Sequence, residues 1–310
     1  MRGIKTLLVG ESKTGKTRSF ETLPRGVVDF SFDRGGWHAL ARTRDTSRKK
    51  GEWEDELWLT ETGRPLTVVN SFKTWVEKED RPLLPKEIVV VDYAHADPVA
   101  LGQYTQFDAT LLTSFIYDFN QLWSLQSVCV EKGICHVTLD SLTSFQRPVL
   151  EYVKAMNARV ITVVQDWGQA IDKIDEIISS GVALPFDFVL TAHTQVERDE
   201  LMGRVRETLL IYGKTLPSVL LAKFDDIFLS VADRTSGGMS YKWGTNRSGP
   251  MQVYIQKGFE KDAPPSQMVP YDGVPVGTRN FTGLPPRVEP NFEKLYGDKL
   301  FHVEAPQKGD

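Results

Sequence analysis

Residues 4–17, Ile4-Lys5-Thr6-Leu7-Leu8-Val9-Gly10-Glu11-Ser12-Lys13-Thr14-Gly15-Lys16-Thr17, decide the fold of this chain. The apolar run is typical of a buried strand, and it leads directly into the pattern G-x-x-x-x-G-K-T, a phosphate-binding loop. Such a loop binds phosphate through backbone N–H groups and the N-terminus of the following helix. The stretch therefore predicts a strand, a loop and a helix that together hold a nucleoside triphosphate.

Each residue type in this loop has a physical role. Gly10 and Gly15 allow a backbone approach that a Cβ would block, Lys16 can reach the β- and γ-phosphates, and the Thr17 hydroxyl can ligate Mg²⁺. The sequence contains no Asn-Lys-x-Asp motif for reading guanine, which favours ATP. We expect the nucleotide contacts to come from Gly10, Glu11, Ser12, Lys13, Thr14, Gly15, Lys16, Thr17 and Arg18.

The composition sets limits on function. The chain has 310 residues, of which 41% are hydrophobic, and a net charge of -4. This is enough for one large domain with additions, and any contact with DNA must come from local basic patches. No apolar run reaches the roughly 18 residues of a membrane span, so we expect no membrane partner and a cytoplasmic location. Cys129 and Cys135 lack the spacing of a zinc site, so we expect buried free thiols.

Hydrophobic patterns along the chain predict an α/β fold, a mostly parallel sheet with helices on both faces. We expect helices at 18–23, 111–132, 148–156 and 165–179, and strands at 4–9, 27–32, 87–92, 136–140 and 186–191. Beyond residue 204 the pattern changes to short strands at 208–212, 226–231 and 239–243, with a hairpin turn at 236–238, which indicates antiparallel strands at the C-terminal edge.

The predicted organisation is one ATPase domain over residues 1–258 followed by a proline-rich arm over residues 259–310. The arm keeps aromatic residues among its prolines, so it either packs on this subunit or a neighbour, or is disordered. Residues 41–85 are irregular and charged, and their fold is hard to predict.

Three aspartates end predicted strands and are candidates for magnesium and water chemistry. Asp140 is the best magnesium residue because it ends an apolar strand and is followed by the hydroxyls of Ser141 and Thr143. Asp33 and Asp92 also end strands, although Asp92 could equally cap the next helix. His193 and Gln195 follow the strand at 186–191, where polar side chains could sense a γ-phosphate.

These motifs, in this order, resemble phage-type nucleotide-binding AAA ATPases of the RecA-like class, and among them the recombination and single-strand-annealing ATPases. The resemblance spans roughly residues 1–250 and rests on the following segments: the phosphate loop, Phe32-Asp33-Arg34-Gly35-Gly36, Leu139-Asp140-Ser141-Leu142-Thr143, Gln165-Asp166-Trp167-Gly168, Leu190-Thr191-Ala192-His193 and Tyr212-Gly213-Lys214-Thr215-Leu216-Pro217. It implies a RecA-like core in which Lys16, Thr17 and Asp140 bind Mg²⁺ and ATP.

The resemblance also implies partners. Many members assemble into a ring or filament and bind single-stranded DNA through loops after the strands that end at Asp140 and Thr191. The matching cations are Arg147, Lys154, Arg159, Arg198, Arg204 and Arg206, which could instead form a solvated charged face. Lys214, Lys242 and Arg247 occupy the region from which a neighbouring subunit contributes a cation to the γ-phosphate, with surface charge as the alternative.

The chain departs from this family at two points. Where many members have a glutamate that activates water, this sequence has Gly35, so that role falls to Asp33, Asp92 or Glu11, or hydrolysis is slow. The separation of Asp33 and Asp140 is long for the family, which implies an insertion within residues 41–110.

Two other functions use the same loop. A nucleotide-gated assembly or packaging ATPase would hydrolyse slowly, which fits Gly35 and the proline-rich arm. A small-molecule kinase needs a lid with several arginines, and the basic run 42–50 could supply one, although it comes early in the chain.

Overall fold

The structure is a computed structural model. It describes residues 3–33, 36–45, 56–77, 86–94, 104–199, 204–213, 216–235, 238–245, 251–255, 267–272, 277–278, 284–285 and 287–300.

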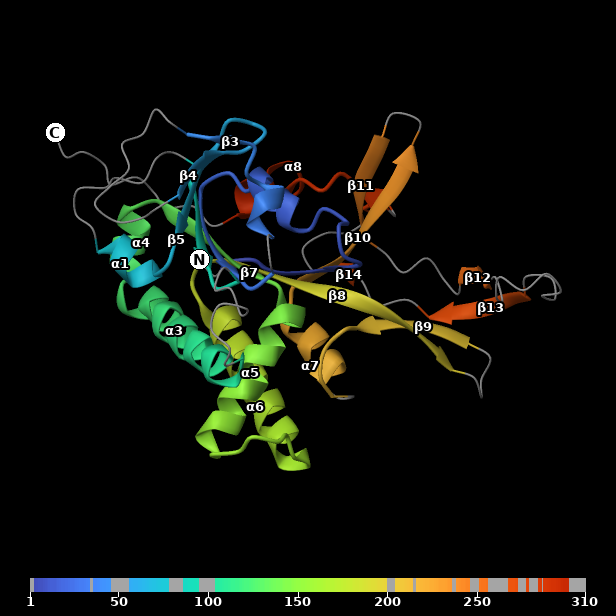
Figure 1. The fold of residues 1–310 in the computed structure, drawn as a ribbon. Helices are drawn as coiled ribbons and strands as arrows, with labels where there is room; N and C mark the ends of the chain where they lie inside the picture. Colours follow the sequence, from blue (N-terminus) through green and yellow to red (C-terminus); the bar gives the residue numbers. More distant parts are fainter. Residues whose placement is uncertain are drawn as a thin grey trace.

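A mostly parallel sheet forms the centre of the molecule (Figure 1). Its strands, across the sheet, follow the order β15-β11-β10-β1-β8-β7-β2-β6-β5-β4-β3. The run from β10 to β5 is parallel, while β11 and β15 at one edge and β4 and β3 at the other are antiparallel. The bounds are β1 (Lys5–Gly10), β2 (Gly26–Ser31), β3 (Thr43–Arg44), β4 (Glu56–Leu59), β5 (Pro65–Val69), β6 (Ile88–Asp92), β7 (Ile134–Asp140), β8 (Asp187–Asp199), β10 (Asp226–Thr235), β11 (Gly238–Gly244) and β15 (Arg287–Val288).

The central strands are apolar on both faces, because side chains alternate across a strand and each face of this sheet is covered. In β1, Leu7 and Val9 join one hydrophobic core, while Ile4, just before the strand, and Leu8 join the other. The helices α3 (Tyr104–Ser124), α5 (Leu142–Met156) and α6 (Val164–Ala183) cover the first face (Figure 1). The 3₁₀ turns η1 (Thr17–Thr22) and η2 (Trp37–Ala39) cover the other with α8 (Phe292–Tyr296). The prediction of an α/β fold with helices on both faces is confirmed.

All four predicted helices differ from their predicted bounds, and α6 differs mainly in ending four residues later, at Ala183. The turn after the phosphate loop is a 3₁₀ turn and not an α-helix, because Pro24 follows and disfavours helical geometry at Leu23, which is extended. α5 begins at Leu142, six residues before the predicted start, because Ser141 caps it, and Pro148 therefore lies inside the helix. The helix expected at 111–132 is two helices, α3 and α4 (Gln126–Glu131), which are separated at Leu125.

The segment that the resemblance marks as an insertion, 41–110, contains β3, β4 and β5, α1 (Phe72–Val76), β6 and the start of α3. β4 and β5 form an antiparallel hairpin, and β5 continues the parallel sheet beside β6. The irregular charged segment thus includes an antiparallel extension of the sheet that the sequence did not predict.

The C-terminal part of the chain adds more strands. The antiparallel pair β10–β11 confirms the predicted hairpin, with Thr235 opposite Gly238, although residues 236–237 of its turn lie outside the described ranges. β8 extends beyond the sheet to pair with β9 (Arg204–Leu209), and β9 pairs with β13 (Gln267–Asp272), which pairs with β12 (Met251–Ile255). β14 (Gly277–Thr278) pairs with β10, and α7 (Leu216–Lys223) lies between β9 and β10 in the chain.

Within the proline-rich arm, β15 and α8 pack on this subunit, and η3 (Gly297–Lys299) follows α8. Residues 301–310 lie outside the described ranges. No helix in the described part of the chain combines the length and the apolar character that crossing a membrane requires.

Candidate nucleotide-binding site

The loop between β1 and η1 has a backbone that only glycine can adopt at two points. Gly10 has φ +147°, and a Cβ there would lie 2.4 Å from the carbonyl oxygen of Ser230 on β10. Gly15 has φ +87°, and a Cβ there would lie 2.9 Å from the Tyr241 ring. The hydroxyl of Ser230 donates to the carbonyl of Thr14 at 2.8 Å, which fixes the loop against β10.

Lys16 is buried inside this loop. Its Nζ donates to the carbonyl oxygens of Gly10 at 3.0 Å and Glu11 at 2.7 Å. Burial lowers the pKa of Lys16 to about 8, against the opposing effect of the nearby carboxylates of Asp140, Asp33 and Glu11. Lys16 is therefore mostly charged at neutral pH, and its ammonium group donates hydrogen bonds to carbonyls of its own loop.

Asp140 lies at the end of β7, and its carboxylate is buried between two threonines. The Thr17 hydroxyl donates to Asp140 Oδ2 at 2.5 Å, and the Thr191 hydroxyl of β8 donates to Oδ1. The contact forms because β8 lies between β1 and β7 in the sheet, so their carboxyl ends meet. Burial and the nearby Asp33 raise the pKa of Asp140 to about 6, while both hydroxyls and Lys16 oppose the rise.

The residues predicted to hold Mg²⁺ are thus in direct contact. A hydroxyl and a carboxylate are hard oxygen ligands of the kind that Mg²⁺ takes, commonly one or two from protein with the rest from water and phosphate. The donor set of Thr17 and Asp140 therefore fits the ion.

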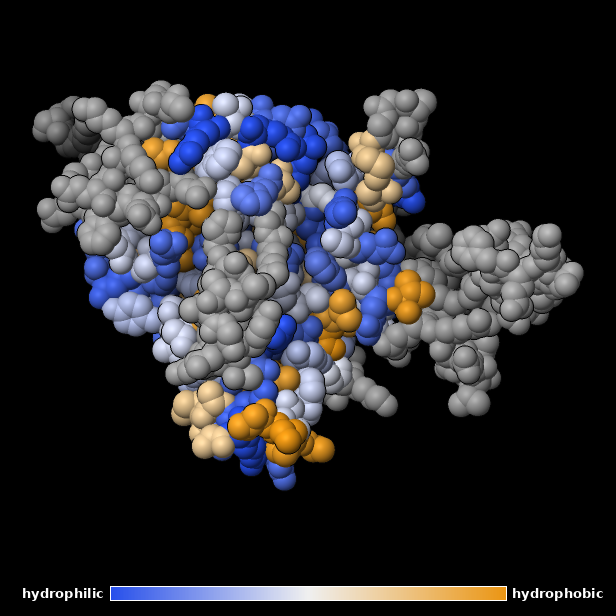
Figure 2. Space-filling view, in the orientation of Figure 1, coloured by the Kyte–Doolittle hydropathy of each residue, from blue (hydrophilic) through white to orange (hydrophobic). Residues whose placement is uncertain are grey.

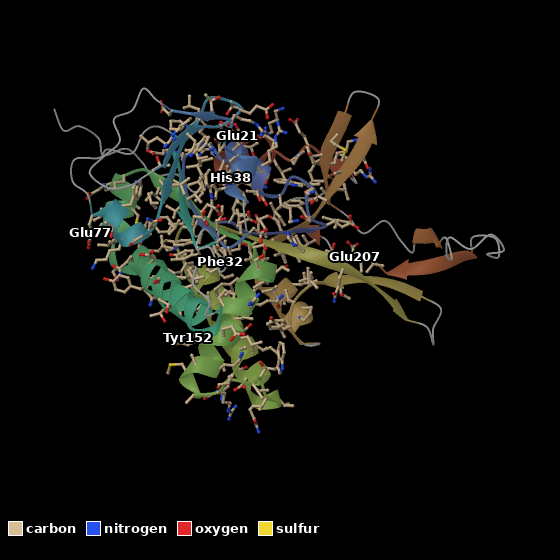
Figure 3. All side chains as sticks on the ribbon, in the orientation of Figure 1. Glu21, Phe32, His38, Glu77, Tyr152 and Glu207 are labelled. Atoms are coloured by element: carbon tan, nitrogen blue, oxygen red, sulfur yellow. The ribbon has the colours of Figure 1, made fainter. Side chains whose placement is uncertain are left out.

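Asp33 follows β2 and lies beside the start of α5. Ser141 donates to its Oδ1 at 2.7 Å and Ser144 donates to the same oxygen. Its Oδ2 lies 3.5 Å from Nε2 of His193. The preceding residue, Phe32, packs against Tyr93, Phe115 and Phe145 between the sheet and the helices (Figure 3), which anchors this chain segment.

His193 lies on β8, where its backbone N–H donates to the Thr143 hydroxyl at 2.9 Å. Burial and the positive charge of Lys16 lower the pKa of His193, although Asp33 acts in the opposite direction. The imidazole is therefore neutral at pH 7, and one carboxylate oxygen of Asp33 faces it.

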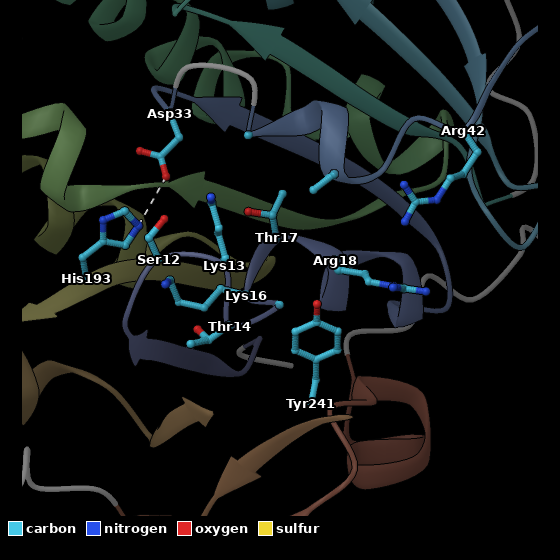
Figure 4. Close-up of a pocket in the computed structure, with 13 residues that line it drawn as sticks. Ser12, Lys13, Thr14, Lys16, Thr17, Arg18, Asp33, Arg42, His193 and Tyr241 are labelled. Carbon is cyan, nitrogen blue, oxygen red and sulfur yellow. Dashed lines mark ion pairs between the residues drawn. The ribbon is translucent and has the colours of Figure 1, made fainter. Parts of the chain in front are cut away.

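Lys16, Thr17, Asp33 and His193 border a cavity of about 580 Å³, within the range of roughly 300–1,000 Å³ that small-molecule sites occupy. In Figure 4, Asp33 and His193 lie at one end, Arg18 and Arg42 at the other, and the phosphate loop lies between them. The lining residues are Ser12, Lys13, Thr14, Gly15, Lys16, Thr17, Arg18, Asp33, Gly36, Ala39, Arg42, His193 and Tyr241.

Five predicted nucleotide, metal and water residues do not line this cavity: Gly10, Glu11, Asp92, Asp140 and Gln195. Asp140 is buried and contacts Thr17, which does line the cavity. Asp92 accepts hydrogen bonds from Trp37 Nε1 at 2.6 Å and from the backbone of Ala94 at 2.8 Å, so it organises the chain beside the site. Gln195 lies two residues beyond His193, where β8 pairs with β9. The side chain of Glu11 is exposed, while its carbonyl accepts from Lys16.

The predicted DNA-contacting cations fall into two groups. Arg147 and Lys154 lie on α5 and Arg159 follows it. Lys154 pairs with Glu151 at 2.8 Å and Arg159 with Asp166 at 2.5 Å. The backbones of Arg198, Arg204 and Arg206 lie on the β8–β9 pair, and their side chains lie outside the described structure.

Of the three candidate cations for a neighbouring site, only Lys242 falls in the described residues, on β11. Its neighbour Tyr241 faces the phosphate loop, and adjacent residues of a strand point to opposite faces. Lys242 therefore points away from the cavity of its own subunit. Lys214 and Arg247 lie outside the described ranges.

Sequence reasoning missed two parts of the cavity. Tyr241 reaches the loop through the pairing of β10 with both β1 and β11, a relation across more than 200 residues that no local pattern reveals. Arg42 belongs to the basic run 42–50, which the sequence offered as a possible kinase lid. Nothing in the sequence indicated that Arg42 would line the cavity beside the phosphate loop. Glu61, which forms an ion pair with Arg42, belongs to no motif that would have marked it in the sequence.

No protein-family model matches this chain, and a search of curated proteins finds no similar sequence.

Proposed function

We propose that this protein is a magnesium-dependent ATPase with a RecA-like core that acts on single-stranded DNA in phage-type recombination or replication. The observation that carries the ATPase part is the contact of Thr17 with Asp140, 2.5 Å apart, beside the buried Lys16 of a complete phosphate loop. The contact requires that β1, which precedes the phosphate loop, and β7, which ends at Asp140, have their carboxyl ends at the same edge of the sheet. Motifs that occurred by chance would have no reason to meet there.

The chain's own residues divide the work of binding. Lys16 exchanges its two loop carbonyls for phosphate oxygens, and the loop backbone donates to the β-phosphate. Thr17 and Asp140 would hold Mg²⁺, which when bound neutralises charge on the β- and γ-phosphates. Tyr241 closes the cavity on the side of β11.

Asp33 is the carboxylate that we assign to the attacking water. It lines the cavity, Ser141 and Ser144 fix one of its oxygens, and the other faces His193. A carboxylate in this position can accept a hydrogen bond from water, and neutral His193 can orient that water or the γ-phosphate. Asp92 already accepts from Trp37 and Ala94, which favours Asp33 over it.

The DNA part of the proposal rests on the resemblance and on the surface beyond α5. The end of α5 and the start of α6 expose Met156, Val160, Ile161 and Val164, which are 69–85% accessible and form the orange patch at the tip of the molecule in Figure 2. Arg159 lies in the same segment. Single strands offer both phosphates and apolar base faces, so a mixed surface of this kind suits them.

The experiment is phosphate release from ATP with and without a single-stranded DNA oligonucleotide, across a series of salt concentrations. We expect DNA to stimulate release at low salt and the stimulation to fade as salt rises, because phosphate contacts are screened. Release that ignores DNA, with phosphate instead appearing on a small-molecule acceptor, would contradict the proposal in favour of a kinase.

Asp33→Asn tests the water assignment in the same assay. We expect turnover to fall by about a hundredfold, in the range of a lost general base, while the dissociation constant for ATP changes less than threefold. Asp92→Asn is the matched control, because it removes a carboxylate outside the cavity. Equal effects of both variants on turnover would contradict the assignment.

A further inference from the structure

The hairpin β4–β5 is attached firmly to the phosphate-loop turn η1. Arg64, at the end of the hairpin turn, is buried and donates to the carbonyls of Glu21 at 2.9 Å and Leu23 at 2.5 Å. Glu21, labelled in Figure 3, accepts from the backbone of Thr62 at 2.8 Å and from its hydroxyl at 2.7 Å. The hairpin turn therefore has a fixed position relative to the nucleotide loop.

This attachment brings Glu61 to the rim of the cavity. One of its oxygens accepts from Arg18 and, at 3.4 Å, from Arg42. Both arginines line the cavity, one from η1 and the other from the chain just before β3. Two guanidinium groups thus share a single carboxylate oxygen at one end of the site.

The residues at the other end of the cavity, Asp33 and His193, indicate which part of a bound nucleotide would contact Arg18 and Arg42. Lys16 of the loop serves the β- and γ-phosphates, and the water carboxylate must lie beyond the γ-phosphate. Asp33 and His193 therefore mark the γ end. Because Arg18 and Arg42 lie on the opposite side of the loop (Figure 4), they face the α-phosphate and the nucleoside.

We propose that Arg18 and Arg42 bind the α-phosphate of the nucleotide, and that Glu61 holds the two arginines at this position until the phosphate displaces it. This inference rests on the proposed function and assigns two residues, Arg42 and Glu61, from outside the phosphate-loop motif.

The energetics allow the exchange. The Arg18, Arg42 and Glu61 side chains are 42%, 43% and 52% exposed, and exposed ion pairs of this kind contribute little to stability. A guanidinium binds phosphate through two parallel, charge-assisted hydrogen bonds. The phosphate loop, which holds the other phosphates of the nucleotide, keeps the α-phosphate close to the arginines. Glu61 therefore competes only modestly for the arginines, and the α-phosphate can displace it.

The test is calorimetric titration of ATP and of ADP, each with Mg²⁺, into the wild type and four variants, Arg42→Ala, Glu61→Gln, Lys173→Ala and Lys16→Ala. We expect Arg42→Ala to raise the dissociation constants of ATP and ADP by the same factor, about tenfold, because both carry the α-phosphate. We expect Glu61→Gln to lower both constants about threefold, because the competing charge is gone. Lys173→Ala is the matched control, an ion-paired cation on α6 away from the cavity, and should change neither.

Several results would overturn the inference. A loss in Arg42→Ala confined to ATP would assign Arg42 to the γ-phosphate, and unchanged binding would remove it from the site. Weaker binding by Glu61→Gln would contradict its role as the displaced carboxylate. Failure of the wild type to bind either nucleotide would overturn the proposed function and this inference with it, whereas loss of binding in Lys16→Ala but not in Arg42→Ala would overturn the inference alone.

Discussion

Lys16 is a cation buried among carbonyl oxygens of its own loop, a position that its long side chain reaches only by folding back over Gly10 and Glu11. The residue type and its motif were readable from the sequence. The depressed pKa was not, because it follows from how deeply the loop is enclosed, and that depends on Tyr241 and β10 from far along the chain.

The lowered pKa of Lys16 predicts a pH dependence of ATP binding. A bound phosphate raises the pKa of Lys16 above its value of about 8 in the unliganded protein. Above pH 8, binding of ATP is therefore accompanied by uptake of a proton on Lys16. We expect the dissociation constant for ATP to be flat from pH 7 to about 8 and then to rise by up to tenfold per pH unit. Calorimetry in two buffers of different ionisation enthalpy measures the proton uptake. A constant affinity up to pH 9.5 would contradict this.

Asp140→Asn should separate stability from activity. The pKa of Asp140 is about 6, above its ordinary value of 3.8, so the folded protein favours the protonated form and loses stability as pH rises from about 4 to 6. Asparagine cannot ionise, so we expect the variant to be more stable than the wild type at pH 7 by about 3 kcal/mol. Thermal unfolding with Mg²⁺ removed measures the difference, which should shrink towards pH 4. A variant less stable than the wild type at pH 7 would refute the argument.

At the scale of elements, the strands were predictable and the pieces around the site were less so. β1, β2, β6 and β7 follow from apolar runs that end in polar residues. The start of α5 was missed because Pro148 looked like a first helical residue, whereas the Ser141 side chain caps the helix one turn and a half earlier. That earlier start is what brings Ser144 to Asp33.

The hairpin β4–β5 escaped prediction because many of the hydrogen bonds that attach its turn to η1 and the residues after it come from one buried arginine, Arg64. Arg64 donates to carbonyls that sequence patterns cannot pair with it, those of Phe20, Glu21, Leu23, Arg25 and Lys86. An arginine in a charged, irregular segment reads as a surface residue. Only the fold shows that it joins the hairpin to η1.

Arg64→Ala should therefore destabilise the molecule and the nucleotide site together. The change leaves several buried carbonyls without donors, so we expect a loss of about 3 kcal/mol in the free energy of unfolding and weaker binding of ATP. Urea unfolding and calorimetry measure the two effects. Arg44→Ala, an exposed arginine of neighbouring β3, is the matched control and should be neutral. Equal stability of the two variants would contradict the role of Arg64.

At the scale of the molecule, the two faces of the sheet are closed by different parts of the chain. One core lies under α3, α5 and α6, whose apolar spacing predicted it. The other core is completed by Phe292, Tyr296 and Leu300, which come from the arm that could equally have been disordered. Composition alone could not decide whether this arm packs or is disordered, because its prolines favour disorder while its aromatic residues favour packing.

Tyr296 joins this C-terminal helix to the central sheet. Its hydroxyl donates to Asp226 Oδ2 at 2.8 Å and lies 3.0 Å from the Thr6 hydroxyl. Tyr296→Phe removes these hydrogen bonds without changing the packing, so we expect a loss of about 1–3 kcal/mol in the free energy of unfolding. Tyr152→Phe, at a half-buried position on α5, should cost less. Urea unfolding of both variants decides, and equal costs would refute the assignment.

The central claim is that the contact of Thr17 and Asp140 beside the phosphate loop is a magnesium-dependent ATP site. Its most direct test is phosphate release from ATP by the wild type with Mg²⁺ and with the ion removed, next to Lys16→Ala and Asp140→Asn. We predict release that needs Mg²⁺, no productive ATP binding in Lys16→Ala, and retained binding without turnover in Asp140→Asn. Undiminished Mg²⁺-dependent release by Asp140→Asn would contradict the account.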